Sequence, residues 1–253
     1  MIKRNYYKIV RIFPDPSSYF YIKNETMNEC EIQIFPFNRE WLNELNLEYS
    51  FDKINWTRVT YDSQYHIYIP ADGYMYFRNT SGSLVTENSN SLFSLFGDIS
   101  IGGDIRTLFN YTDVESVTKI PDYGFNHPFN MFNDAKISDI SNLSFRGITE
   151  IGNYGLYDAF NSGNPTITKG VDLRDVTIIG ESALGQLYQN CHNLKEAYAP
   201  NVSTWDTSKT MFWLYDVAST GVLYKPSTLT IPTDDYNGAG LPSGWTTQDY
   251  PIK

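Results

Sequence analysis

Cysteine and histidine are both scarce in this sequence. The only cysteines are Cys30 and Cys191, far apart in the chain, so we expect two isolated free thiols rather than a disulfide framework. Of the three histidines, only His192 has a potential metal ligand close by, because it follows Cys191 directly. Adjacent side chains in a turn rarely chelate a metal without further ligands. We therefore expect no metal site.

Long apolar runs are also missing. No segment approaches the roughly 18 apolar residues that a membrane-spanning helix needs, so we expect no membrane insertion. The N-terminal stretch MIKRNYYKIVRIFPDPSSYF starts with basic residues but lacks the apolar core of a signal peptide. Lys8, Arg11 and Pro14 interrupt each of its apolar runs. The sequence predicts a protein that is made in a cytoplasm and is not exported by the general route.

Positive charge is in deficit. The 19 Lys and Arg residues stand against 29 Asp and Glu, which gives a net charge of −10. Nine basic residues lie in 1–90 and ten in 91–253, so no basic patch offsets the deficit. This distribution argues against nucleic acid or an anionic membrane as partner. Hydrophobic residues make up 41% of the chain and charged residues 19%, as in a globular protein.

Signatures of catalysis and cofactor binding are absent. The glycine pair in DISIGGDIR (98–106) is not part of a GxGxxG or P-loop motif, and no GxSxG occurs. The stretch IPTDDYNGAG (231–240) lacks the first carboxylate and the closing Glu of a calcium loop. We expect no cofactor and no enzyme. Glycoside hydrolysis by two carboxylates stays an open alternative, since any two of the 29 acidic residues can meet in the fold.

Aromatic residues are abundant, at 16% of the chain with 20 tyrosines. Tyrosine-rich surfaces suit recognition, because each ring covers a large area with few torsions to freeze. The alternative is that a β-rich fold uses Tyr and Phe in its strands.

Residues 1–80 alternate between apolar or aromatic runs and turn residues, as short strands do. ECEIQI (29–34) and LNLEYSFD (45–52) alternate strictly, and YHIYI (65–69) and YMYFR (74–78) flank the turn PADG. We predict a small antiparallel β-sandwich of about six or seven strands at 1–85. The polar stretch NTSGSLVTENSNS (79–91) marks the boundary to a second domain at 86–253.

The second domain repeats itself. ITEIGNYGLYDAFNSG (148–163) aligns with VTIIGESALGQLYQNC (176–191), and aromatic anchors recur at intervals of 13, 23, 28, 28 and 27 residues. Apolar residues at i, i+3 and i+4 predict a short amphipathic helix in each unit, beside one strand. Such units bury their apolar faces only when stacked, which predicts a β/α solenoid. The predicted repeat core comprises Met131, Phe132, Leu156, Phe160, Leu184, Leu187, Tyr188, Leu214 and Tyr215.

These repeats resemble a known family. ITEIGNYGLYDAF (148–160) and VSTWDTSKTMFWLY (202–215) are similar to units of BspA-like leucine-rich-repeat proteins. Residues 219–250 are similar to the C-terminal cap of such arrays, and 47–78 to the small β-domain often found in front of them. The resemblance implies a β-sandwich followed by a leucine-rich-repeat-type solenoid. It also implies surface proteins of gut Bacteroidetes and of their bacteriophages, which act in adhesion or as virion components.

Three functional hypotheses follow. The first is a non-enzymatic bacteriophage virion protein (capsid decoration, head fibre or tail-associated subunit), oligomeric in the assembly, contacting other virion proteins and a host surface glycan or protein. The missing export signal favours it over the second, a bacterial cell-surface adhesin that binds host matrix or glycans. The third is an enzyme, for which no positive feature exists.

Three aromatic residues are candidates for partner binding. Tyr198, Trp205 and Trp213 lie in the last two repeats and outside the three-position core pattern. Rings displayed on one face of a solenoid can stack on sugars or fill a pocket of a partner. The alternative is that Trp205 and Trp213 pack the C-terminal cap.

Overall fold

A computed structural model describes residues 19–34, 47–59, 65–80, 93–95, 98–122, 136–161, 166–234 and 236–251. Over these residues the protein is mainly β with almost no helix, and it contains a β-solenoid of about four turns. The strands are β1 (Phe20–Asn24), β2 (Cys30–Ile34), β3 (Leu47–Ser50), β4 (Thr57–Arg58), β5 (Tyr65–Ile69), β6 (Tyr74–Asn79), β7 (Phe93–Leu95), β8 (Asp98–Asp104), β9 (Lys119–Ile120), β10 (Lys136–Ser144), β11 (Glu150–Ile151), β12 (Ile178–Ile179), β13 (Glu196–Tyr198), β14 (Gly221–Lys225) and β15 (Trp245–Asp249). The short 3-10 helices are η2 (Ile105–Leu108), η3 (Val114–Ser116) and η4 (Thr207–Lys209).

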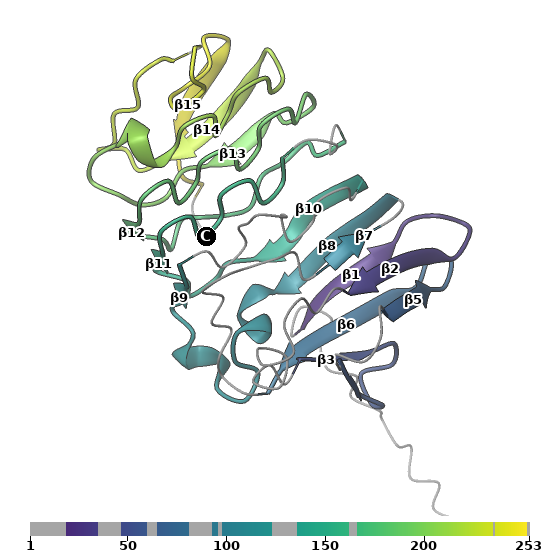
Figure 1. Cartoon of the computed structure of the whole chain (residues 1–253). Coiled ribbons are helices and arrows are strands. Elements are labelled where there is room, and N and C mark those ends of the chain that lie inside the picture. The colour runs from purple at the N-terminus through teal and green to yellow at the C-terminus, as the bar shows by residue number, and fades with distance from the viewer. Residues whose placement is uncertain are drawn as a thin grey trace, which may run out of the picture.

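Two sheets form the part of the molecule opposite the solenoid (Figure 1). The larger has six strands in the order β10-β8-β1-β6-β3-β4, and the smaller has the antiparallel order β5-β2-β7. Burial alternates in β1, where Phe20 and Ile22 are buried while Tyr21 and Lys23 lie on the opposite face. The strict alternation predicted for 45–52 does not hold to its end, because Ser50 is buried and Phe51 is exposed. The inward side chains of both sheets belong to one hydrophobic core.

The larger sheet extends past residue 85. β8 pairs antiparallel with β1, and β10 pairs parallel with β8, although both follow the polar stretch at 79–91. Strands from both sides of the predicted domain boundary, 1–85 and 86–253, therefore belong to this one sheet. The pairing of β8 with β1 joins residues about 80 positions apart in register, such as Ile22 with Ile101, which no local pattern reveals.

The solenoid consists of parallel rungs (Figure 1). One wall is formed by β9, β11 and β12, with Ile151 paired to Ile179 at a separation of 28 residues. Another wall is formed by β13, β14 and β15, with Tyr198 paired to Tyr224. Ile151 and Ile179 are buried, so successive turns place equivalent residues on top of one another.

The segments between these walls are not the short helices that the sequence predicts. They are chains of turns in which every fourth residue has a positive φ, for example Tyr154 and Asp158 at 54° and 61°. Alternate residues donate to the next rung, as Leu156 N does to Ala183 O at 2.9 Å and Phe160 N to Leu187 O at 3.1 Å. A positive φ at this interval stops an α-helix from propagating. The segment becomes a hydrogen-bonded arc instead.

The arcs keep the burial pattern of the predicted helices. Two residues in every four face the core, because the φ pattern also repeats every four residues. The predicted core residues that the structure buries in this way are Leu156, Phe160, Leu184, Leu187, Tyr188 and Leu214. Phe160 and Tyr188 stack with ring centroids 6.0 Å apart. Met131 and Phe132 lie outside the described residues.

The last arc has a different register from the predicted one. Tyr188 N donates to Trp213 O at 3.1 Å, in the way that Phe160 N donates to Leu187 O. Leu214 therefore takes the anchor position of Tyr188, and Trp213 takes that of Leu187. Tyr215, expected in the core, is instead 37% exposed, whereas Leu214 is 2% exposed. The repeat shortens to 26 residues between Tyr198 and Tyr224, which shifts the anchor by one position relative to the spacing of 27 read from the sequence.

Core truncations test this register. Phe160→Ala should lower the free energy of unfolding by about 3–5 kcal/mol and Leu214→Ala by about 2–5 kcal/mol, because both leave cavities in the solenoid. Tyr215→Ala, the matched control, should cost less than about 1 kcal/mol because its side chain is exposed. Urea denaturation of the three variants measures the differences. A larger loss of unfolding free energy in Tyr215→Ala than in Leu214→Ala would support the register predicted from the sequence instead.

Candidate functional site

The three predicted binding residues all contribute to packing. Trp213 is fully buried and offers no ring face to a partner. Trp205 is half-buried against Trp213 with ring centroids 4.9 Å apart, and its Nε1 donates to Ala239 O at 2.8 Å. Trp205 and Trp213 thus join the last arc to the C-terminal segment. This is the packing alternative that the sequence left open.

Tyr198 is also covered. It is 7% exposed and stacks on Tyr224 of the next rung at 4.9 Å. Lys169 Nζ lies 5.5 Å and the Arg174 guanidinium 5.6 Å from its ring centroid. These cations close over the ring from the preceding rung, so Tyr198 stabilises the stack rather than displaying an aromatic surface.

A different aromatic surface lies on the six-stranded sheet, on the side away from the core. We call it the aromatic face. Alternation along β1 and β6 produces it, because Phe20, Met75 and Phe77 point into the core and the intervening residues point away. Its members are Tyr19, Tyr21, Trp56, Tyr74, Tyr76 and Tyr111, of which Tyr19 and Tyr76 are themselves buried.

Ring contacts link the aromatic face into one cluster. Tyr74 and Tyr76 stack at 5.8 Å with an interplanar angle of 6°, and Tyr21 meets Tyr74 edge-on at 5.4 Å. Tyr19 stacks on Tyr111 at 5.3 Å, and their hydroxyl oxygens lie 3.0 Å apart. Such contacts fix the rings before any partner arrives.

The glycine pair of β8 makes room for this cluster. A Cβ at Gly102 would collide with the phenol of Tyr21, which lies across the strand. Gly103 has a φ of 84°, in the region that favours glycine, and a Cβ there would collide with the Tyr19 carbonyl. The pair seen in the sequence therefore serves the close approach of β1 and its tyrosines.

Cations are interleaved with the rings. The Arg78 guanidinium lies 4.0 Å from the centroid of Trp56 and 5.2 Å from that of Tyr111, while its Nε contacts Glu48 Oε2 at 2.6 Å. Lys53 Nζ lies 4.3 Å from the centroid of Tyr76. These contacts hold long, flexible side chains in one geometry, which lowers the entropy that binding must overcome.

The hydroxyls of Tyr19, Tyr21 and Tyr76 stay protonated near neutral pH. Burial, together with the hydrogen bond to Tyr111, raises the pKa of Tyr19 to about 12. Burial also raises the pKa of Tyr21 and Tyr76 above the usual value of a tyrosine. A protonated phenol both donates and accepts hydrogen bonds. With Tyr74 at 37% exposed, the face combines an accessible ring with fixed neighbours.

Other kinds of site were sought in the part of the chain that the structure describes. No group of three or more His, Cys, Asp or Glu side chains there is placed to hold a metal ion. Nor do those residues form a helix with the length and apolar character that crossing a membrane requires. No family model, curated protein or solved structure matches the chain.

Both cysteines are buried thiols rather than members of a disulfide. Cys191 directly follows the second arc, its Sγ donates to Phe160 O of the first arc at 3.3 Å, and burial raises its pKa to about 12. At pH 8 a thiol of that pKa is only about one part in ten thousand thiolate, whereas an unperturbed cysteine is roughly one quarter thiolate.

Thiol labelling tests this environment. In a Cys30→Ala variant, Cys191 should react with Ellman's reagent at pH 8 at least about a thousandfold more slowly than in the urea-unfolded chain, because only the thiolate attacks. The absorbance of the released thiolate measures both rates. Rapid labelling of the native variant would show that the arc opens readily and that Cys191 is not held in the core.

Proposed function

We propose that this chain is a non-enzymatic attachment protein of a bacteriophage virion, as a capsid decoration, head fibre or tail-associated subunit. The aromatic face docks the protein on other virion proteins, and the solenoid is displayed outward. The observation that carries the proposal is the aromatic face, with Tyr74 accessible among ordered rings and Arg78 held between Trp56 and Tyr111.

The chemistry of this face suits a protein partner. Tyr, Trp and Arg dominate the residues that contribute most to binding at protein interfaces. Ring and cation contacts already order these side chains, so docking freezes few additional torsions. The net charge of −10 favours a partner surface with complementary positive charge at the rim.

The finer architecture forms part of the same proposal. The two sheets are taken as a β-sandwich and the parallel rungs as a leucine-rich-repeat-type solenoid of the BspA-like kind. The 28-residue offset between β11 and β12 supports the solenoid assignment. The resemblance of 148–160 and 202–215 to BspA-like units supports it too. Many copies on one particle turn weak individual contacts into lasting attachment through effective concentration.

The location of the native protein tests the proposal first. Mass spectrometry of density-purified phage particles, beside the washed envelope of the bacterial host, should recover the chain with the particles at a fixed ratio to the capsid protein. Recovery in the envelope instead would contradict the virion assignment. It would support the alternative, a bacterial cell-surface adhesin that binds host matrix or glycans.

Docking through the aromatic face has its own test. Tyr74→Ala removes the accessible ring that packs on Tyr21 and Tyr76 and should weaken binding to particles that lack the protein by about 2 kcal/mol or more, roughly thirtyfold. The matched control is Tyr68→Ala, which removes a 54% exposed tyrosine from β5 of the smaller sheet. Quantitative co-sedimentation measures both. Equal binding by Tyr74→Ala and the unaltered protein would move the docking surface elsewhere.

A further inference from the structure

Three successive rungs carry the same short pattern where the large sheet meets the solenoid. Ser144 pairs in register with Asp104, and 144–147 lies beside 172–175, where Gly147 N donates to Asp175 Oδ2 at 3.1 Å. In each rung a buried apolar residue separates two polar or charged residues. The rungs are Asp104-Ile105-Arg106, Ser144-Phe145-Arg146 and Asp172-Leu173-Arg174.

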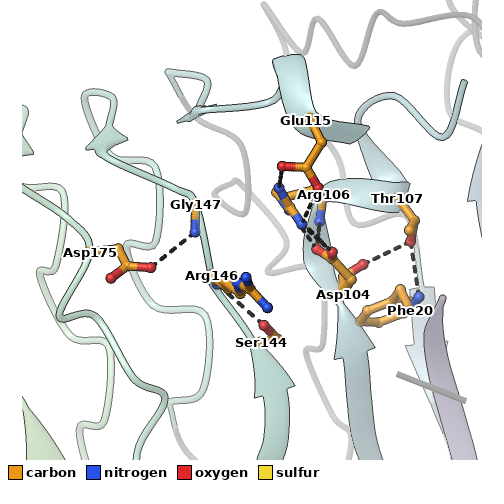
Figure 2. Close-up of polar contacts among 9 residues, drawn as sticks. All are labelled: Phe20, Asp104, Arg106, Thr107, Glu115, Ser144, Arg146, Gly147 and Asp175. Atoms are coloured by element: carbon orange, nitrogen blue, oxygen red, sulfur yellow. Dashed lines mark hydrogen bonds and ion pairs between the residues drawn. The ribbon is translucent and has the colours of Figure 1, made fainter. Parts of the chain in front are cut away.

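The arginine of the first rung pairs with two carboxylates. Arg106 Nη2 lies 2.8 Å from Asp104 Oδ2, and its Nε lies 3.1 Å from both carboxylate oxygens (Figure 2). Glu115 Oε2 adds a contact to Arg106 Nη1 at 3.3 Å. Hydrogen bonds to Asp104 and Glu115 raise the pKa of Arg106 above its usual value, although burial alone would lower it.

The third rung repeats this geometry. Arg174 Nη2 lies 2.6 Å from Asp172 Oδ2, and its Nε lies 2.8 and 3.0 Å from the two oxygens. In both rungs the backbone N–H of the arginine also donates to the aspartate, at 3.0 Å in the first and 3.1 Å in the third. Each of these arginines is thus matched by a carboxylate two residues earlier.

The middle rung lacks that carboxylate. Ser144 occupies the aspartate position, and its Oγ accepts from the backbone N of Arg146 at 3.3 Å (Figure 2). Arg146 is exposed. Among the described residues, no ion pair and no side-chain hydrogen bond uses its guanidinium. Arg146 therefore lacks the carboxylate two residues earlier that pairs with Arg106 and with Arg174, so its guanidinium can pair with a carboxylate from outside the chain.

A cavity lies at this position. It has a volume of about 430 Å³ and is lined by Ser144, Phe145, Arg146, Asp172 and Asp175. That volume falls within the roughly 300–1,000 Å³ typical of small-molecule sites. The lining offers the Arg146 guanidinium as a donor, beside one hydroxyl and two carboxylates that accept hydrogen bonds.

We propose that this cavity binds an acidic sugar residue of the uronic acid type. The sugar carboxylate takes the place of the side-chain carboxylate that the middle rung lacks and pairs with Arg146, as Asp172 pairs with Arg174. The ring hydroxyls donate to the Asp175 carboxylate and to Ser144. An acidic peptide side chain brings the same carboxylate but no hydroxyls to offset its approach to Asp175, so the lining favours the sugar.

This inference deepens the proposed function by naming the ligand of the displayed solenoid, and it rests on that function for its biological role. Binding of a sugar to the purified chain is nevertheless independent of where the native protein resides. If the native protein is recovered with phage particles but the purified chain does not bind the sugar, only the proposed ligand is refuted. If the purified chain binds the sugar but the native protein is not recovered with phage particles, only the virion assignment is refuted.

The test is a ligand-observed NMR titration of the full chain with glucuronate, glucose and acetate. Glucuronate should bind saturably, with a dissociation constant of about 1 mM, and glucose and acetate should bind at least tenfold more weakly. No saturable binding of glucuronate would overturn the proposal. Equal binding of acetate would overturn the assignment to a sugar and favour an acidic peptide.

The variants use the neighbouring rungs as templates. Ser144→Asp supplies the missing carboxylate, so it should weaken glucuronate binding at least tenfold while leaving the urea denaturation midpoint unchanged or higher. Ser144→Ala, the matched control, keeps the position uncharged and should retain binding within about fivefold. Arg146→Gln should lose binding at least tenfold. Unchanged affinity in Ser144→Asp and Arg146→Gln would show that glucuronate binds elsewhere.

Discussion

Backbone hydrogen bonds between successive rungs are the interaction on which the rest of this structure depends. Gly152 N donates to Ile120 O and Gly180 N to Ile151 O, both at 2.8 Å, and the arcs continue the same ladder. A side chain at Gly180 would collide with the backbone N of Asn153, so glycine stands where consecutive turns approach most closely. Only this spacing lets Phe160 stack on Tyr188, since no single turn buries its apolar residues alone.

The sequence predicted the repeat well where two turns have closely similar sequences. The alignment of Ile151 with Ile179 and of Phe160 with Tyr188 corresponds to the observed rungs, because equivalent core positions tolerate only similar apolar shapes. The arcs were misread as helices, since hydrophobic spacing does not record the sign of φ. Leu214 and Tyr215 are both apolar neighbours, so composition alone did not reveal which one faces inward.

The candidate sites were harder to foresee. Alternation in YMYFR showed that β6 has two faces but not that Tyr74 and Tyr76 lie on the one away from the core. The cavity at Arg146 depends on β8, β10 and the first solenoid rung lying in register, which only the fold brings about. The signal was nevertheless present in the sequence, as an Asp-x-Arg pattern that repeats at 104 and 172 and is broken by Ser144.

The edge of a stack of parallel strands can pair with a further strand, and β15 is the edge strand of its wall. After the buried Trp245, its residues Thr246 to Asp249 are all exposed and none is apolar. A second molecule adding its own strand there would have to strip water from hydroxyl, amide and carboxylate groups without gaining a hydrophobic seam. The composition of β15 thus disfavours end-to-end pairing of two molecules through this edge.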